Sequence, residues 1–165
     1  MNIEVREAKE ADLPSLNIIF NWHCDHSYST FQDPTNFEER KQWFKKFDDD
    51  KQVLLVAEKA GEVIGFACSL IYRNGGVFKN TLETSVYVHH QFVGARVGSI
   101  LYQNLFNNLK NKKVHRIVVG IALPNDASVA LHHKFGFEKI GIFDEYAFYK
   151  EKYISSLWMQ KKINV

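Results

Sequence analysis

A strand that leads through a glycine-containing loop into a helix is the feature that most constrains how this chain folds. Apolar and polar side chains alternate along residues 81–89, as in a strand with two distinct faces. Gly94 and Gly98 follow, and apolar residues at helical spacing continue through residues 97–111. A helix N-terminus carries unpaired N–H groups, and glycine lets the backbone approach a phosphate closely. The segment is compatible with a phosphate-binding turn. Taken alone, however, it favours the alternative, a turn that needs small residues for steric reasons.

The two faces of the strand at residues 81–89 differ in character. One face carries Leu82, Thr84, Val86 and Val88, and the other carries Glu83, Ser85, Tyr87 and His89. The assignment follows because successive side chains of a strand point to opposite faces.

Hydrophobic periodicity elsewhere predicts strands and helices throughout the chain. The predicted strands are residues 2–7, 52–58, 63–72, 81–89, 115–122, 137–148 and 151–161, and the predicted helices are 9–24, 36–47, 97–111 and 124–134. This order predicts an α/β (α+β) fold with a mixed, largely antiparallel central sheet. In the second helix an aromatic stripe is expected to lie in the core: Phe37, Trp43, Phe44 and Phe47.

Composition excludes several classes of protein. A chain of 165 residues suits one domain, expected to span residues 1–165. The net charge of +2 argues against nucleic acid or an anionic membrane as the main partner. No signal peptide or apolar stretch of about 18 residues is visible. Cys24 and Cys68 are too few for a disulfide framework, so two free thiols in a cytoplasmic protein are expected.

A second motif follows the glycine loop after one more predicted strand. It combines Pro124-Asn125-Asp126-Ala127, Leu131-His132 and Phe135-Gly136-Phe137. Together with Ser29-Thr30-Phe31, Thr81–His89 and Trp158-Met159-Gln160, this motif resembles the GNAT superfamily of N-acetyltransferases, in particular the phosphinothricin acetyltransferase branch. The resemblance covers nearly the whole chain. It implies a sheet flanked by helices, with a V-shaped gap between the fourth and fifth strands.

The resemblance also implies that acetyl-CoA lies in this gap as a co-substrate. The implied contacts are Val86 and Val88 to the pantetheine arm, Gly94, Ala95, Arg96, Val97, Gly98 and Ser99 to the pyrophosphate, Asn125 to the pantetheine, and Lys134 near the cofactor. The chain departs from the family pattern at Val93, where Arg or Gln is usual, and at Arg96, where Gly is usual. Arg96 is expected to return the lost charge, although a bulky residue there could instead weaken binding.

Two residues are the candidates for acid–base chemistry. By resemblance Glu83 is the general base that removes a proton from the attacking amine, and His132 is the general acid for the departing thiolate. The alternatives are a solvated strand carboxylate and a packing histidine. The neighbouring pairs His89-His90 and His132-His133 are not expected to bind metal, because adjacent side chains on a strand point to opposite faces.

The predicted reaction moves an acetyl group to the primary amine of a small amino-acid-like molecule. By resemblance the acceptor pocket is lined by Phe31, Arg73, Phe78 and Lys79, and Arg73 or Lys79 could bind a substrate carboxylate. Two alternatives remain. One is an acetyltransferase for a protein N-terminus or a polyamine, and the other is a CoA-binding or interaction module that has lost catalysis. A homodimer is compatible with the resemblance.

Overall fold

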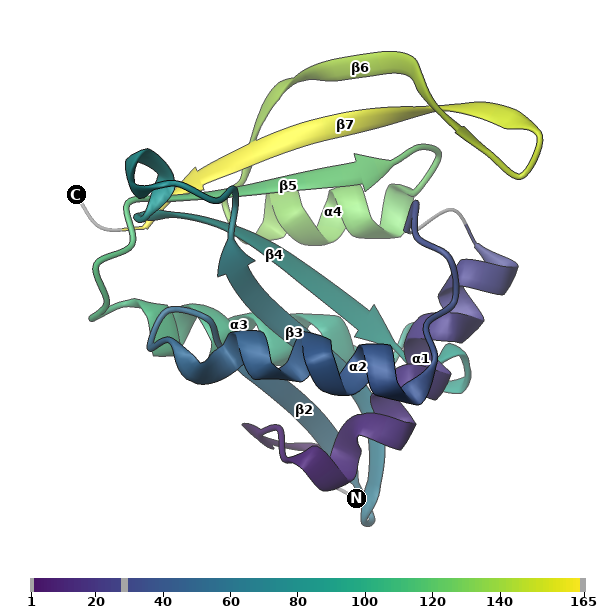
Figure 1. Ribbon diagram of the computed structural model, residues 1–165, viewed down its shortest axis with the longest axis vertical. Coiled ribbons are helices and arrows are strands. Elements are labelled where there is room, and N and C mark those ends of the chain that lie inside the picture. Colours follow the sequence, from purple (N-terminus) through teal and green to yellow (C-terminus); the bar gives the residue numbers. More distant parts are fainter. Residues whose placement is uncertain (1, 28–29, 164–165) are drawn as a thin grey trace.

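A computed structural model describes residues 2–27 and 30–163 of the chain. Seven strands form one sheet in the order β1-β2-β3-β4-β5-β7-β6 (Figure 1). The strands are β1 (Glu4–Glu7), β2 (Leu54–Lys59), β3 (Glu62–Ile71), β4 (Thr81–Val88), β5 (Arg116–Ala122), β6 (Glu138–Tyr149) and β7 (Lys152–Lys162). The helices are α1 (Leu13–His26), α2 (Phe37–Phe44), α3 (Val97–Leu109) and α4 (Asp126–Lys134). Short 3-10 turns cover Glu10–Asp12, Lys45–Asp48, Gly76–Phe78 and His90–Phe92.

The predicted order of strands and helices is confirmed, and so is the mixed, largely antiparallel sheet. The second predicted helix differs from the expectation. Its α-helical part ends at Phe44, and a 3-10 turn follows in which Phe47 has non-helical dihedral angles of φ −91° and ψ 22°. Tyr28 and Ser29 of the predicted first loop lie outside the described residues.

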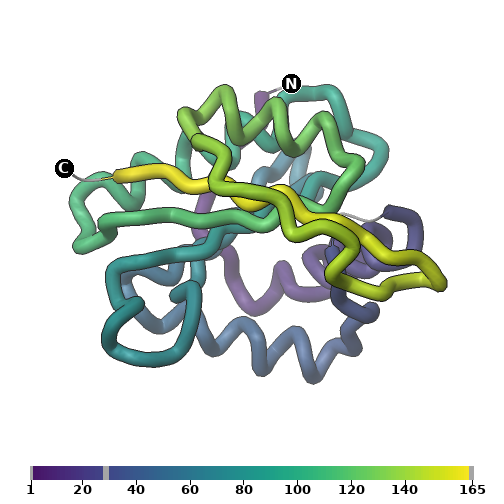
Figure 2. The backbone as a smooth tube through the Cα atoms, turned by 90° about the horizontal axis from the view of Figure 1, so that it is seen from above, coloured from purple at the N-terminus to yellow at the C-terminus, as the bar shows by residue number. Residues whose placement is uncertain are grey.

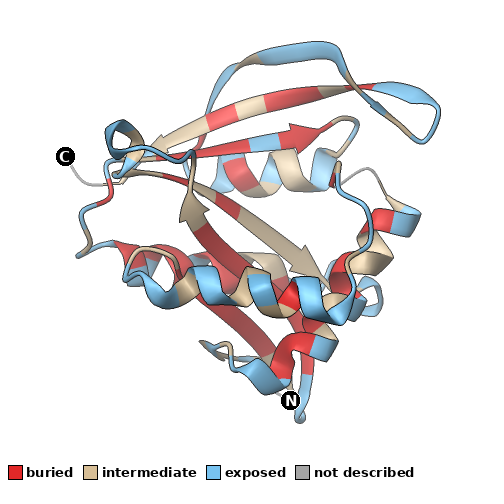
Figure 3. Ribbon diagram, viewed as in Figure 1, coloured by how far each residue is buried: buried red, intermediate tan, exposed pale blue. Residues whose placement is uncertain are grey.

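Two apolar clusters cover the two faces of the sheet. Along β2, Leu55 and Ala57 belong to the cluster that contains α3, whereas Leu54 and Val56 belong to the cluster that contains α1. The alternation arises because successive side chains of a strand point to opposite faces. Figure 3 shows β2 and β3 as largely buried and β6 as largely exposed. Figure 2 shows α4 on one side of β5 and β7, and α1 and α2 on the other.

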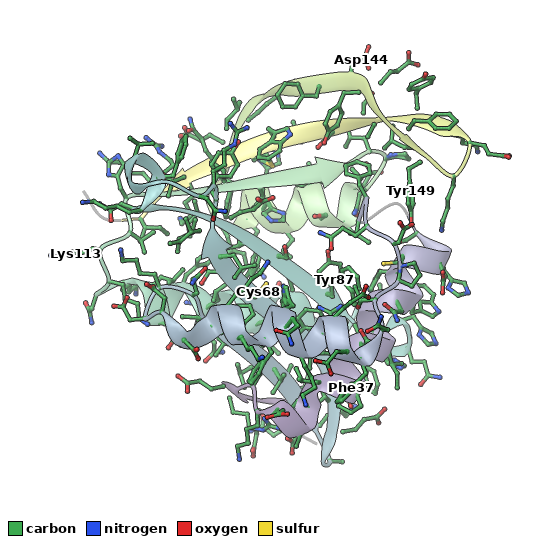
Figure 4. The ribbon with its side chains drawn as sticks, in the orientation of Figure 1. Phe37, Cys68, Tyr87, Lys113, Asp144 and Tyr149 are labelled. Atoms are coloured by element: carbon green, nitrogen blue, oxygen red, sulfur yellow. The ribbon has the colours of Figure 1, made fainter. Side chains whose placement is uncertain are left out.

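The aromatic stripe of α2 is only partly in the core. Trp43, Phe44 and Phe47 pack against the α1 cluster, but Phe37 is 47% exposed. The prediction for Phe37 is therefore wrong. Phe37 is the first residue of the helix, at the end of α2 where Figure 4 labels it. The residue of α2 that is buried is instead the charged Arg40.

The sheet opens between its fourth and fifth strands, as predicted. The parallel ladder between β4 and β5 joins only Thr81–Glu83 to Arg116–Val118. Beyond it the two strands diverge, and β5 continues to pair with β7 as far as Ala122. The opening leaves the later residues of β4 facing a space between the two halves of the sheet. Among the described helices, none is both long and apolar enough to span a membrane.

Candidate active site

A cavity of about 520 Å³ occupies the opening between β4 and β5. Its walls are β4 from Glu83 to Val88, β5 from Val119 to Ala122, and α4 with the loop that precedes it. Trp22 and His23, near the end of α1, close it from the other side. A second cavity of about 190 Å³ lies on the α1 and α2 side of the sheet and shares Gln32, Glu83, Ser85 and Tyr87 with the first.

The glycine loop, residues 94–96, places the N-terminus of α3 at the edge of this opening. Gly94 has a φ of +86°, and Arg96, which precedes the first residue of α3, has a φ of +64°. Both values lie in the left-handed region, which glycine adopts freely and arginine does not. The turn exposes the first N–H groups of α3, which have no partner within the helix. This arrangement suits an anion such as a pyrophosphate.

Two further observations fit the phosphate-bearing end of acetyl-CoA. Lys134 Nζ donates to Ser99 Oγ at 3.1 Å, so α4 adds a cation beside the first turn of α3. A Cβ atom on Gly98 would lie 3.4 Å from Leu131 and 3.8 Å from Val86 and Val88. The missing side chain therefore keeps the passage between α3, α4 and β4 open. Val93 is exposed beside this loop.

Asn125 begins α4 at the wall of the larger cavity. Its Oδ1 accepts a hydrogen bond from Ser128 N at 3.1 Å, which caps the helix. Its Nδ2 has no partner among the described residues, and the side chain lines the cavity. The amide can therefore donate to a polar group of a bound ligand.

Glu83 lies where the two cavities meet. It is half-buried and makes no hydrogen bond or ion pair in the described part of the chain. Burial raises the pKa of the Glu83 carboxyl above its ordinary value, because the charged form loses hydration. An unpaired carboxylate with a raised pKa is well suited to take a proton near neutral pH.

His132 is 3% exposed and has hydrogen bonds at both ring nitrogens. Its Nδ1 lies 2.7 Å from the Ser128 carbonyl oxygen, so Nδ1 carries the hydrogen. Nε2 therefore accepts from the Tyr102 hydroxyl at 2.9 Å. Burial lowers the pKa of His132, which keeps the imidazole neutral. In this form Nε2 holds no proton to donate.

Tyr102 is a residue of this site that sequence reasoning did not single out. It comes from α3, is fully buried and lines the larger cavity. Its hydroxyl lies 3.4 Å from Thr84 Oγ1 on β4. Its neighbours Leu101 and Leu105 belong to the apolar stripe of α3, so the ring resembles one more core residue. The one feature of the sequence that could have singled out Tyr102 is its hydroxyl, because a tyrosine in an apolar stripe needs a hydrogen-bond partner for that group.

Of the four residues predicted to line the acceptor pocket, one lines a cavity and three do not. Phe31 lines the larger cavity, but Arg73, Phe78 and Lys79 line neither of the two cavities. Phe78 packs against Tyr72, and the Arg73 guanidinium lies 4.9 Å from the centre of the same ring. No group of three or more potential ligand side chains within residues 2–27 and 30–163 is arranged to hold a metal ion.

A split sheet, a helix N-terminus with free N–H groups and an unpaired carboxylate lie around one opening, an arrangement that suits a phosphate-bearing co-substrate. The sequence model of the acetyltransferase (GNAT) family matches residues 16–137. The chain therefore belongs to the GNAT family and is an N-acetyltransferase.

Relatives of known name or structure match nearly the whole chain. Phosphinothricin N-acetyltransferase of Streptomyces coelicolor is 34% identical, over 98% of this chain and 96% of its own. L-methionine sulfoximine/L-methionine sulfone acetyltransferase of Pseudomonas aeruginosa is 32% identical, over 86% of this chain and 83% of its own. A putative acetyltransferase from Salmonella typhimurium, solved with acetyl-CoA, is 27% identical with a TM-score of 0.93, covering 98% of this chain and 94% of its own.

Proposed function

We propose that the protein transfers the acetyl group of acetyl-CoA to the primary amine of a small amino-acid-like molecule. The observation that carries the proposal is Glu83, an unpaired half-buried carboxylate between a co-substrate gap and a separate smaller cavity. The S. coelicolor and P. aeruginosa relatives carry the names of enzymes for amino-acid-like acceptors, which supports the same class here.

Glu83 acts as the base in this proposal. An ammonium group has no lone pair, so the acceptor must lose a proton before it attacks. Glu83 takes this proton, directly or through one water molecule. Acetyl-CoA supplies the activated acetyl thioester when bound. The amine attacks it directly, so no residue of the chain forms a covalent bond to the acetyl group.

The gap positions the thioester from several sides. Val86 and Val88 lie beyond the β4–β5 ladder, so they have no partner on β5, although the Val88 carbonyl accepts from His23 Nε2 at 2.9 Å. In this proposal the remaining backbone groups of the two residues bind the pantetheine arm. Gly94 to Ser99 and Lys134 hold the phosphates, and Asn125 Nδ2 donates to the arm. Holding the reactants in line removes most of the entropy cost of their encounter.

Tyr102 and His132 act together at the departing thiolate. A neutral His132 accepts from Tyr102, so this pair fixes the hydroxyl at the floor of the gap. We assign to this hydroxyl the role of stabilising the thiolate and passing a proton to it. His132 then acts through Tyr102, by accepting from the hydroxyl and holding it in place, rather than by direct contact. The Tyr102 oxygen that has given its proton to the thiolate regains one from solvent water.

An acceptor screen tests the proposed reaction. Released thiol is measured with acetyl-CoA and single amino acids, methionine sulfone, phosphinothricin, a polyamine and a short peptide. Turnover is expected with amino-acid-like acceptors. Turnover with the polyamine or the peptide alone would assign a different acceptor class. Binding of acetyl-CoA with no turnover of any acceptor would identify a module that has lost catalysis.

A further inference from the structure

The C-terminal end of α1 lies at the open end of the gap, where β4 and β5 have diverged. Trp22 and His23 line the larger cavity there. Figure 1 and Figure 2 show this end of α1 beside the turn between β6 and β7. Within the described residues, strand pairing joins β4 to β5 only at the opposite end of the gap. The contacts of α1 with both halves of the sheet therefore decide how far apart the two strands are held at the open end.

His23 bonds to a backbone carbonyl of β4 that lies beyond the β4–β5 ladder. Val88 pairs with Gly65 of β3. The next pair along the same ladder is hydrogen-bonded, because His89 N donates to the Ile64 carbonyl oxygen at 2.9 Å. Bonded and non-bonded pairs alternate in an antiparallel ladder, so the N–H and C=O of Val88 point away from β3 and into the gap. His23 Nε2 donates to that C=O at 2.9 Å, in the place that β5 would occupy in a continuous sheet.

Stacked rings hold the same end of α1 to the loop that follows β4. The rings of Trp22 and His90 lie with their centres 4.7 Å apart and their planes 14° apart. His90 begins the short 3-10 turn that precedes the glycine loop. The end of α1 is therefore fixed to the first half of the sheet at two points, Val88 and His90.

The turn between β6 and β7 holds this end of α1 from the other half of the sheet. Tyr149 Oη donates to the Cys24 carbonyl oxygen at 3.0 Å. Lys150 Nζ donates to the carbonyl oxygens of Cys24 and Asp25, at 2.7 Å for Asp25. These carbonyls belong to the last turn of the helix, where a cation is favourable. Figure 4 shows Tyr149 between the β6–β7 turn and α1.

The conformation of this turn supports a specific role for Lys150. β6 ends at Tyr149 and β7 begins at Lys152, so the turn consists of Lys150 and Glu151. Their φ values are +47° and +60°, a conformation in which glycine and asparagine are preferred. The turn itself therefore gives no reason for a lysine, whereas the two carbonyl contacts with α1 do.

We infer that His23 and Lys150 are positioning residues, which join the two halves of the sheet through the C-terminal end of α1 and hold the open end of the gap at the width that the pantetheine arm of acetyl-CoA requires. The inference rests on the proposed placement of acetyl-CoA in the gap. Neither residue is assigned a contact with the reacting atoms. By engaging the Val88 carbonyl, His23 also fixes the direction of the Val88 N–H toward the arm.

A purely stabilising role makes a different prediction. Lys150 would then be only a cation at the end of a helix, and His23 only a buried ring. Their loss would lower the melting temperature without distinguishing one ligand from another. Acetyl-CoA and 3′-phospho-ADP, its nucleotide part, separate the two roles. Both ligands carry the phosphates that face α3, but only acetyl-CoA has the arm that lies between β4 and β5.

Calorimetry measures the Kd of both ligands for the parent, for Lys150→Met, for His23→Leu and for the double variant. Each single substitution is expected to raise the Kd for acetyl-CoA by about tenfold and to leave that for 3′-phospho-ADP within about twofold. The double variant is expected to bind acetyl-CoA about as weakly as either single variant, because both contacts act through the same end of α1. Lys152→Met is the matched control. It removes an exposed cation beside the same turn and should bind both ligands as the parent does.

Three results would overturn the inference. They are an equal loss for both ligands, an unchanged Kd for acetyl-CoA in the single variants, or a loss in the double variant equal to the product of the two single losses. If His23→Leu does not fold, His23→Gln keeps an amide donor and should retain part of the affinity, while Lys150→Met still decides the comparison.

Failure of the proposed reaction is seen separately, as an absence of turnover by the parent in the acceptor screen, and leaves these binding measurements intact. A parent that binds 3′-phospho-ADP but not acetyl-CoA more tightly would overturn the placement of the arm and the inference together.

Discussion

At Glu83, burial raises the pKa of the carboxyl that is proposed as the general base. Glu83→Gln keeps the shape of the side chain and removes the base. It is expected to lower kcat by about 10²–10⁴, with a much smaller change in the Kd for acetyl-CoA. Steady-state kinetics and a binding titration measure the two quantities. A kcat that stays at the parent value from pH 6 to pH 9 would exclude Glu83 as the base.

The raised pKa of Glu83 also predicts two effects of pH. The base must be ionised, so kcat/KM should fall as the pH drops through a pKa above the ordinary 4.5. The folded chain binds this proton more tightly than the unfolded chain. Raising the pH between the unfolded and folded pKa values therefore lowers the free energy of unfolding. At neutral pH Glu83→Gln should melt at or above the parent temperature. A clearly lower melting temperature would show that the carboxylate is stabilising.

Tyr102 tests the proposed chemistry at the thiolate. Tyr102→Phe keeps the buried ring and deletes the hydroxyl that bonds to His132. The expected result is a fall in kcat of about tenfold or more, from loss of the proton-transfer group. Thr84→Val is the control, since it removes only the weaker partner of the same hydroxyl. Equal kcat values for Tyr102→Phe and the parent would remove this pair from the mechanism.

Arg96 combines a strained backbone with a positive charge beside the phosphate site. Its φ of +64° is as unfavourable for alanine as for arginine, whereas glycine adopts it freely. Arg96→Ala therefore deletes the charge alone and should raise the Kd for acetyl-CoA by about tenfold. Arg96→Gly deletes the charge and the strain together. If Arg96→Gly binds acetyl-CoA more tightly than the parent, the side chain obstructs the site and does not replace the cation missing at Val93.

At the scale of elements, the start of α1 is fixed to the sheet by one charged network. Arg6 of β1 donates to Asp12 at 2.7 and 2.9 Å and to Glu58 of β2 at 2.8 and 3.0 Å. Asp12 also accepts from Lys9 N at 2.7 Å. The hydrogen bonds from Arg6, more than any other cause, lower the pKa of Asp12 below its ordinary value. This network sets where α1 leaves β1 and therefore where α1 covers the sheet.

The network predicts a pH-dependent loss of stability in Asp12→Asn. At pH 7 the variant should unfold more easily by about 1–3 kcal/mol, the usual range for a charged hydrogen bond. Because the folded pKa is depressed, the contribution of Asp12 is complete above its unfolded pKa and is lost as the pH falls through the folded pKa. Urea unfolding at pH 7 and below pH 4 measures both differences. A difference between parent and variant that does not shrink in acid would contradict the assignment.

At the scale of the whole molecule, the sheet consists of two halves joined by a short ladder. Among the described residues, only 81–83 and 116–118 pair as strands across the opening, so a ligand in the gap would contact both halves. Acetyl-CoA is therefore expected to stabilise the folded protein, by about 2.7 kcal/mol at a concentration of 100 times its Kd. A thermal melt with millimolar acetyl-CoA, compared with the same concentration of ATP, measures this effect. An unchanged melting temperature would contradict binding in the gap.

Much of this architecture could be predicted from the sequence, because it depends on local periodicity. Alternation along β4 assigned Leu82 and Glu83 to opposite faces, and the structure places Leu82 in the α3 cluster and Glu83 in the cavities. The glycine loop and the start of α3 were visible for the same reason. The roles predicted for Glu83, Asn125 and His132 remain predictions, and the structure brings these three residues to one cavity.

Tertiary structure alone decided which side chains meet. Phe37 is aromatic and was expected in the core, whereas Arg40 belongs to a residue type that is mostly exposed. The structure reverses both, because α2 packs on α1 through the turn that contains Arg40. Tyr102 and His132 lie 30 positions apart, and their hydrogen bond forms only when α3 and α4 pack together. Periodicity reports which face of an element is turned inward, but the partner of a buried polar atom depends on a neighbour distant in sequence.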